Sequence, residues 1–475
     1  MKKNLFLLLS ILALGLWSFG AFTFPVNVSN SSVSSQWPAV CFGTDGMVHM
    51  VWVVTYSATS SDVVYVNYDG VTWSTPVKIT ATPDHGRTFP FIACNDKGTL
   101  AVVWEQSGGE TWINVFDYVK RTWGTEEMVD EAWTGYLNKP KVALDPYGNI
   151  YCFYFTRGLG YAYTKCKING VWEARFRVNL NRLRTKEGMI AVAGDGRIWV
   201  AYSNKMTNGQ YKVYFRTRTK DTPFSGGRAP SPGKTTEEQA YLAVDPTTNI
   251  PWVTYMGNEG TEGSNFVNLV KLDEKNYPRE SVIPERLEHY PRLAIDSEGK
   301  GHVAVEIGQG DNGTGIIYTN NVDGPWTTPI DLPNSGGGPK LPNIAADPYG
   351  NVAVVWDSMI DMVPQAWFTS RYPVEIKHFY APAGRSVKIG ITGTMHDYAL
   401  TYTLSWAKNP DNNDKFIRGY RIYKKTGAGD YEFVVEVDKT VFSQSFNFTA
   451  LLGKVQFAIS TVSTAGFEGE RVSFF

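Results

Sequence analysis

The stretch LPNIAADPYGNVAVVWD, from Leu341 to Asp357, decides the fold. Two apolar segments flank an Asp-Pro-Tyr-Gly turn, a pattern that predicts two antiparallel β-strands joined by a tight connection. The chain carries six further copies of this unit, which begin at Trp37, Phe89, Lys139, Glu187, Gln239 and Tyr290. The sequence therefore predicts a repeat protein built from β-strands.

The copies follow one another at a regular interval. When they are aligned on the residue that ends the turn, successive copies lie 48 to 52 residues apart. The aligned turn residues are Gly46, Gly98, Gly148, Gly196, Thr248, Gly299 and Gly350. Five residues earlier every copy has Cys41 or an Ala, and the preceding position is always branched and apolar. Small residues at one position indicate a ring in which neighbouring strands crowd together, and the branched residues should fill the layers between sheets.

Several copies continue into a second hairpin. A third strand, an Asp-Gly or Asn-Gly turn, an aromatic residue and a short fourth strand follow, as in the segments at 63–79, 161–178 and 316–332. Asp-Gly and Asn-Gly are strong hairpin signals because both central positions of the tight turn need a positive φ. Each repeat is then a four-stranded meander, the size of one propeller blade. We predict an all-β fold, with a seven-bladed β-propeller over residues 21–371.

The seventh repeat lacks its last strand in the sequence that follows it. The missing segment is found at the other end of the chain, where 24–29 matches the fourth-strand segments 75–80 and 328–333. We infer that the N-terminal strand completes the seventh blade and closes the ring, which removes an exposed sheet edge.

Residues 1–20 have the layout of a secretory signal peptide. Lys2 and Lys3 precede an apolar run from Leu5 to Trp17, and cleavage is expected just after Gly20. An uncleaved membrane anchor is the alternative. We expect a secreted or cell-envelope protein that makes no membrane contact after cleavage and is a monomer.

Composition excludes one class of partner. The 475 residues contain 45 Lys and Arg against 46 Asp and Glu, with a formal net charge of −1 at pH 7. A chain so balanced offers no basic surface for a polyphosphate, so we exclude nucleic acid.

Four cysteines in a chain of 475 residues are too few for a disulfide framework. Cys41 and Cys94 fit the pattern of buried thiols. Cys152 and Cys166 flank the turn at 157–160 at similar distances, so a bridge across that hairpin stays open. The cysteine spacings match no zinc site, and we expect no cofactor.

From about residue 372 the periodicity stops. The stretch from Leu400 to Val437, followed by 455–474, resembles a fibronectin type III domain. The resemblance implies a β-sandwich with Trp406 in the second strand, Tyr420 and Tyr423 in the third, and the alternation of Phe457, Ile459 and Thr461 in the sixth. Domains of this type usually act as spacers or docking modules.

The propeller repeats resemble those of sialidase-type propellers. The turn Asp69-Gly70-Val71-Thr72-Trp73 is a degenerate Asp-box, and the turns at 169–172 and 323–326 are weaker versions. In that family the box is structural and lies away from the active site. Sialidases use three arginines, whereas here Arg292 stands alone at its repeat position, so sialidase activity is doubtful.

Ligands of propellers usually bind where loops enter the first strands and leave the second strands. The candidate ligand-binding residues on that face are Arg87, Glu105, Lys141, Arg157, Tyr241, His289, Tyr290, Arg292, Glu306 and Asp357. Hairpin pairing should set Glu306 opposite His289 and Asp357 opposite Lys340. The alternative is that both are complementary cross-strand pairs at a sheet end.

Two readings of the site remain open. In the first, the protein recognises a glycan or a protein at the channel mouth, with Trp37, Phe89, Trp133, Tyr136, Tyr241 and Tyr290 as sugar-stacking rings. In the second, it is a carbohydrate-active enzyme. Paired acids would then suit a glycosidase, whereas Arg, His and Tyr together would suit a polysaccharide lyase, which is the more favoured of the two.

Overall fold

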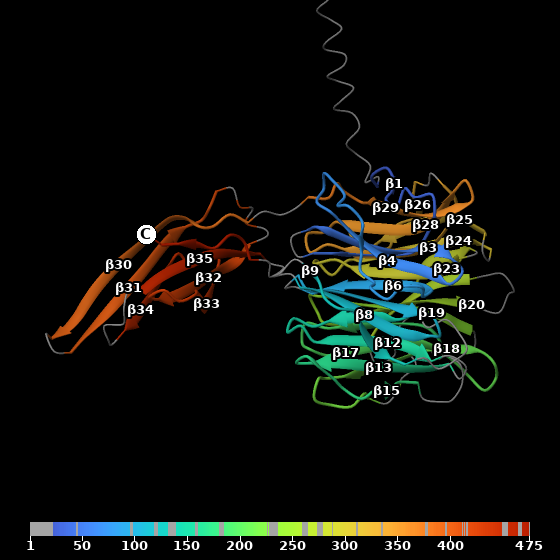
Figure 1. The fold of residues 1–475 in the computed structure, drawn as a ribbon, viewed down its shortest axis with the longest axis horizontal. Helices are drawn as coiled ribbons and strands as arrows, with labels where there is room; N and C mark the ends of the chain where they lie inside the picture. The colour runs from blue at the N-terminus through green and yellow to red at the C-terminus, as the bar shows by residue number, and fades with distance from the viewer. Residues whose placement is uncertain are drawn as a thin grey trace, which may run out of the picture.

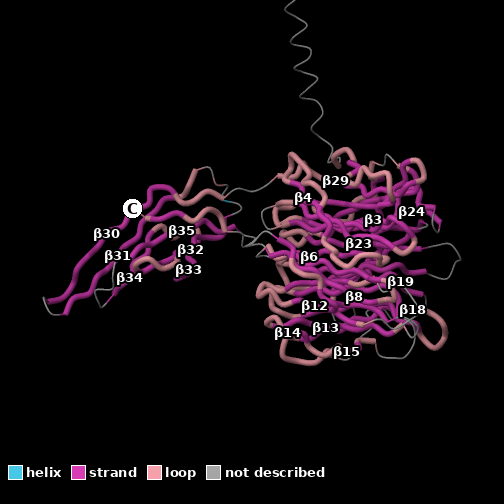
Figure 2. The backbone as a smooth tube through the Cα atoms, viewed as in Figure 1, coloured by secondary structure: helices cyan, strands magenta, loops and turns pink. Residues whose placement is uncertain are grey.

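The structure of the chain is a computed structural model. The structure describes residues 22–474 apart from 44–45, 96–97, 118–121, 132–138, 157–159, 180–184, 226, 228–235, 259–264, 273–278, 287, 310–311, 334–335, 376–378, 395–396, 411, 413, 415–416, 449–454 and 464–467. Figures 1 and 2 show an all-β architecture, in which strands and loops account for every labelled element. The predicted all-β class is confirmed.

Residues 26–370 form seven antiparallel sheets, each made mostly of strands that follow one another along the chain. The first sheet comprises β2 (Ser34–Phe42), β3 (Val48–Ser57), β4 (Ser60–Tyr68) and β5 (Val77–Lys78). The second comprises β6 (Arg87–Cys94), β7 (Leu100–Gln106), β8 (Glu110–Asp117), β9 (Thr122–Trp123) and β10 (Glu127–Asp130). The third comprises β11 (Lys141–Leu144), β12 (Ile150–Thr156), β13 (Tyr161–Ile168), β14 (Val171–Trp172) and β15 (Phe176–Arg177). The next two comprise β16 (Thr185–Val192), β17 (Ile198–Lys205) and β18 (Tyr211–Arg218); and β19 (Thr236–Val244), β20 (Pro251–Asn258), β21 (Asn265–Lys271) and β22 (Arg279–Arg286). The last two comprise β23 (Glu288–Ile295), β24 (Gly301–Gln309), β25 (Asn312–Asn320) and β26 (Ile330–Asp331); and β27 (Gly337–Ala346), β28 (Val352–Ile360), β29 (Val363–Ser370) and β1 (Val26–Asn27).

The first strand of each repeat is the innermost one. β2, β6, β11, β16, β19, β23 and β27 each contact the next in this order, and β27 contacts β2. This arrangement of meander sheets around an axis is that of a β-propeller. The small residues of the repeat line a channel between these strands, as the sequence predicts; among them are Cys41, Ala93, Ala143, Ala191 and Ala243.

The branched residue beside each small residue is buried in every repeat. These side chains are Val40, Ile92, Val142, Ile190, Leu242, Leu293 and Ile344, and none is more than 4% exposed. The prediction that they fill the layers between sheets is confirmed. Burial of this kind supplies most of the free energy that holds neighbouring sheets together.

The recurring Asp of the first turn ties the hairpin together. Oδ1 of Asp347 accepts the backbone N–H groups of Tyr349 and Asn351 at 2.8 and 2.7 Å. Asp145 and Asp296 do the same in their own repeats. An Asp carboxylate that bonds the backbone two and four residues on stabilises a tight turn, which explains why the pattern DPYG marks the repeat.

β1 pairs antiparallel with β29, with Val26 opposite Phe368 and Asn27 opposite Trp367. Just before it, Phe22 is buried and packs edge to face on Tyr318, with ring centroids 4.8 Å apart. The segment from the N-terminal end of the chain thus lies in the same sheet as residues 337–370.

The C-terminal residues form two facing sheets with a core of their own. One contains β30 (Ala383–Thr394), β31 (Asp397–Ala407) and β34 (Ser443–Phe448), and the other β33 (Glu432–Asp438), β32 (Ile417–Thr426), β35 (Val455–Ser463) and β36 (Val472–Ser473). Trp406 lies in β31, Tyr420 in β32 and Phe457 in β35, and all three belong to one apolar cluster.

The cysteines remain thiols. Cys152 pairs with Lys165, and Cys166 pairs with Tyr151. The two thiols are thus one position out of register and point to opposite faces of the sheet, because side chains alternate along a strand. Cys152 packs in one apolar cluster and Cys166 in another. The bridge left open by the sequence is therefore absent, and all four cysteines are free.

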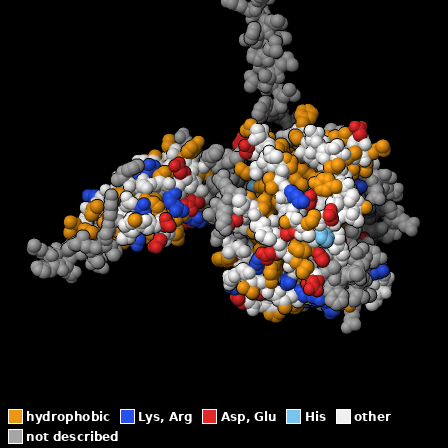
Figure 3. Space-filling view, viewed as in Figure 1, with side chains coloured by type: hydrophobic (Ala, Val, Ile, Leu, Met, Phe, Trp, Pro, Cys, Tyr) orange, Lys and Arg blue, Asp and Glu red, His pale blue; other side chains and the backbone are white. Residues whose placement is uncertain are grey.

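Two observations concern the surface. Within the described ranges, the chain contains no apolar helix long enough to cross a membrane. On the face seen in Figure 3, basic and acidic side chains are interspersed over the sheets.

Candidate functional site

Six of the innermost strands are interrupted at the same place. The pairing of β2, β6, β16, β19, β23 and β27 with the next strand shifts register eight or nine residues before the end of the turn, the mark of a β-bulge. At this position six residues have a positive φ between 44° and 57°, namely Trp37, Phe89, Lys139, Gln239, Tyr290 and Leu341. A left-handed backbone is costly for bulky residues, and such strain clusters at functional sites.

The left-handed residues are held by the neighbouring sheet. The N–H of Trp37 donates to Oδ1 of Asp357 at 2.8 Å, and the N–H of Leu341 donates to Oε2 of Glu306 at 2.7 Å. The N–H of Tyr290 likewise donates to the side chain of Gln239. Each of these acceptors belongs to the sheet that precedes the bulge around the ring, so contacts between sheets maintain the strained conformation.

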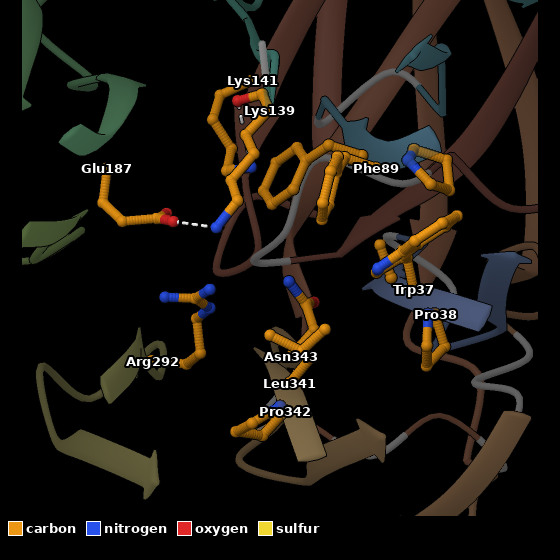
Figure 4. Close-up of a pocket in the computed structure, with 13 residues that line it drawn as sticks. Trp37, Pro38, Phe89, Lys139, Lys141, Glu187, Arg292, Leu341, Pro342 and Asn343 are labelled. Carbon is orange, nitrogen blue, oxygen red and sulfur yellow. Dashed lines mark hydrogen bonds and ion pairs between the residues drawn. The ribbon is translucent and has the colours of Figure 1, made fainter. Parts of the chain in front are cut away.

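The bulges surround a hollow at the mouth of the channel. Figure 4 shows the side chains that point into it from strands of different sheets. The polar and aromatic residues of its lining are Trp37, Phe89, Phe91, Lys139, Lys141, Glu187, Arg292 and Asn343. We call this hollow the channel mouth.

Three cationic side chains and one carboxylate line the channel mouth. Lys139 forms an ion pair with Glu187, drawn as a dashed line in Figure 4. Burial by itself would raise the pKa of Glu187, but Lys139, Arg292 and Lys141 together lower it to about 2. Glu187 is therefore ionised at any physiological pH.

Lys141 is buried beside the ring of Phe91, with Nζ 4.9 Å from the ring centroid. Burial, assisted by the nearby charges of Arg292 and Lys139, lowers the pKa of its ammonium to about 7. Lys141 is thus the group at the channel mouth whose charge changes near neutral pH.

Arg292 lies between two tyrosine rings. Its guanidinium carbon is 5.1 Å from the ring centroid of Tyr241 and 5.7 Å from that of Tyr290. Burial raises the pKa of Tyr241 to about 12, so its phenol is protonated. Lys141, Tyr241, Tyr290 and Arg292, all predicted from the sequence, therefore come together at one place.

The predicted acids lie elsewhere. The register that sets His289 opposite Glu306 and Lys340 opposite Asp357 is confirmed. However, Glu306 and Asp357 are each only 1% exposed and bond the backbone of the next sheet, as described above. Burial raises the pKa of Asp357 well above its ordinary value. Glu105 is also buried and accepts a hydrogen bond from the hydroxyl of Thr88 at 3.3 Å.

The remaining predicted residues are spread out. Arg87 is buried, and its guanidinium donates to the carbonyls of Ser61 and Thr82 and pairs with Asp62. His289 is half-buried beside Tyr290, and burial lowers its pKa. Arg157 lies outside the described residues, as do the aromatic candidates Trp133 and Tyr136.

The sequence pattern does not single out Glu187. The feature that could have identified Glu187 is its position in the repeat. Successive repeats have Trp37, Phe89, Lys139, Glu187, Gln239, Tyr290 and Leu341 there. That position carries large or charged side chains throughout, but only the bulge turns it toward the axis. In the part of the chain that is described, no three His, Cys, Asp or Glu side chains are grouped to hold a metal ion.

No family model and no curated protein matches the sequence. Among solved structures, an α-L-arabinanase from Penicillium chrysogenum is similar at 12% identity with a TM-score of 0.46, over 74% of this chain and 98% of that one. Hydrazine synthase from Kuenenia stuttgartiensis is similar at 12% identity with a TM-score of 0.48, over 72% of this chain and 98% of that one. A Hadza microbial sialidase, Hz136, is similar at 13% identity with a TM-score of 0.42, over 71% of this chain and 65% of that one. At these identities and TM-scores, the likenesses carry no argument about chemistry.

Proposed function

We propose that this chain is an exported seven-bladed β-propeller protein that recognises a glycan or protein ligand at the channel mouth. The observation that carries the proposal is the cluster of left-handed residues around the axis, which presents Trp37, Phe89 and Tyr290 beside cationic side chains. The Trp37 and Phe89 ring centroids lie 4.9 Å apart, with their planes at 43°. Aromatic rings of this kind bind the apolar faces of sugars and the side chains of proteins.

The proposal includes the architecture that builds this mouth. The seven sheets of residues 21–371 are seven blades, and the pairing of β1 with β29 supports closure by the N-terminal strand. The sandwich of three and four strands over 372–475 supports a fibronectin type III domain. The basic, apolar start of the chain supports export to the cell envelope or beyond.

A carbohydrate-active enzyme is the second candidate, and one observation favours a lyase over a hydrolase. Tyr241 and Tyr290 flank Arg292. In a lyase, the guanidinium would neutralise the uronate carboxylate and a phenol would act in proton transfer. In contrast, Glu306 and Asp357 are occupied by backbone N–H groups. Incubation of the protein with acidic polysaccharides tests this candidate: unsaturated products that absorb in the ultraviolet would establish a lyase.

Binding assays test the main proposal. We expect a screen of glycans and extracellular proteins to yield a ligand whose affinity falls at least about tenfold in Trp37→Ala, since loss of a central aromatic anchor costs about 2 kcal/mol or more. Tyr147→Ala is the matched control, because Tyr147 is 82% exposed and lies at the opposite end of its hairpin. Ligands that bind Trp37→Ala as tightly as the unchanged chain would place recognition elsewhere.

A further inference from the structure

The charges at the channel mouth do not balance. Glu187 is the one carboxylate among the described residues of its lining, and it is paired with Lys139. For Lys141 and Arg292, no carboxylate of the described residues lies within ion-pair distance. Nζ of Lys141 donates to the carbonyl oxygens of Pro140 and Lys139, at 3.3 and 3.5 Å. A guanidinium N–H of Arg292 donates to the carbonyl of Pro291 at 3.2 Å.

Both cations are largely removed from water. Lys141 is 8% exposed and Arg292 is 9% exposed. A buried cation without a partner anion is costly, and proteins normally pair it. The compensating negative charge is therefore expected from a ligand.

The surroundings indicate which anion fits. A guanidinium binds a planar carboxylate through two parallel hydrogen bonds, and an ammonium adds a point charge. Trp37, Phe89 and Tyr290 stand at the same mouth and present faces for a sugar ring. Figure 4 shows Lys139, Lys141 and Arg292 pointing into the hollow that Trp37 and Phe89 also line. Nζ of Lys139 lies 5.2 Å from the centroid of the Phe89 ring.

We propose that the ligand of the channel mouth is an acidic glycan, whose uronate carboxylate binds Lys141 and Arg292 while its ring stacks on the aromatic side chains. This inference rests on the proposed function and names the ligand class for the same site. It assigns binding and no chemical step.

The proposal predicts a pH dependence of affinity. The charged groups that face Lys141 are Glu187, Arg292 and Lys139, and its ammonium titrates near neutral pH. Of these groups, Glu187 keeps its charge between pH 6 and 9, because its pKa is lowered to about 2. A bound carboxylate raises the pKa of Lys141, so binding near pH 7.5 takes up protons and weakens as the amine loses its charge at pH 9.

The experiment is calorimetric titration of the full chain with galacturonate, glucuronate and mannuronate oligosaccharides, their methyl esters and neutral counterparts. Methyl esters keep the shape of the sugar and remove its charge. We expect an acidic oligosaccharide to bind at least about tenfold more tightly than its ester, and more tightly at pH 6 than at pH 9. Titrations in buffers of different ionisation enthalpy measure the proton uptake.

Variants assign the effect to the two cations. Lys141→Met should abolish the proton uptake and the change in affinity with pH, whereas the same substitution at exposed Lys388 should leave both unaltered. Arg292→Gln is the second variant and should weaken binding of the acid more than binding of the ester. Thermal melting of each variant shows whether the fold is intact.

The outcomes separate the two proposals. Esters or neutral sugars that bind as tightly as the acids, with loss of binding in Trp37→Ala, would overturn the acidic-glycan assignment and leave recognition at the channel mouth intact. If acids bind but Lys141→Met and Arg292→Gln bind them equally well, the assignment to these cations is wrong. If no ligand from any screen responds to Trp37→Ala, the proposed function itself fails.

Discussion

At the scale of single residues, the buried acids show how a carboxylate near a ligand site can serve the backbone instead. Asp357 accepts the Trp37 N–H through Oδ1, while its Oδ2 has no hydrogen-bond partner and is buried. Because the partner of Oδ1 is an N–H of a strained residue, we interpret Asp357 as a support of the bulge. The left-handed Trp37 side chain is in turn what reaches the channel mouth.

Substitution of Asp357 tests this role. Asp357→Ala should lower the free energy of unfolding by about 1 to 3 kcal/mol, since it leaves the Trp37 N–H buried without an acceptor. Asp357→Asn keeps an acceptor and does not titrate. Burial raises the pKa of Asp357 in the folded state above its unfolded value of about 3.9. The contribution of Asp357 to the free energy of unfolding of the wild type is therefore largest below pH 3.9 and falls as the pH rises.

The stability of Asp357→Asn relative to the wild type should therefore improve steadily from pH 4.5 to pH 8 in urea unfolding. Titrations elsewhere in the chain cancel in this difference. A difference that does not change with pH would contradict the burial of an ionisable Asp357.

At the scale of elements, the N-terminal segment has the clearest consequence. Phe22 is 7% exposed and packs on Tyr318, whereas Phe24, two residues on, is 89% exposed. Phe22→Ala should cost about 3 to 5 kcal/mol, as for other buried Phe residues, and Phe24→Ala should stay within about 0.5 kcal/mol. Deletion of 21–33 removes β1 as well and should lower the melting temperature of residues 34–371 further.

Thermal melting monitored by tryptophan fluorescence measures these three variants against the unchanged chain. If the deletion variant melts like the full-length chain, closure by the N-terminal strand is wrong.

Much of the strand pattern follows from local sequence. Alternating apolar residues and the Asp turn predict the hairpins of residues 341–357 and 290–306, and the register beside each turn follows from the turn. Beyond the bulge the register is shifted by one residue, so that His289 and not Tyr290 pairs with Glu306. The bulge is different, because residues as unlike as Trp37 and Lys139 adopt the same left-handed backbone. No propensity of these residue types predicts it. At Trp37, Tyr290 and Leu341, a hydrogen bond from the backbone N–H to the preceding sheet stabilises it.

At the scale of the whole molecule, the C-terminal sandwich has its own core. Trp406, Tyr420, Ile422 and Phe457 belong to a cluster that contains no residue of 22–371. A unit with a separate core can unfold separately.

Trp406→Ala tests this independence. We expect differential scanning calorimetry of the full chain to show two transitions, with only the one assigned to 372–475 shifted, because the lost burial of about 3 to 5 kcal/mol is confined to that unit. The isolated C-terminal fragment identifies which transition is its own. A single transition that shifts as a whole would mean that the two units unfold together.

The sequence by itself determined the repeat, the β-class, the turn chemistry and the balanced charge of this protein, because each depends on residues close together in the chain. Only the tertiary structure decided which side chains share the channel mouth, since Lys139, Glu187 and Arg292 come from different sheets and meet only when the ring assembles. It also decided that Asp357 and Glu306 support the bulges of the following sheets. A buried polar group takes the partner that the packing of distant segments brings within reach, and local sequence carries no record of that distance.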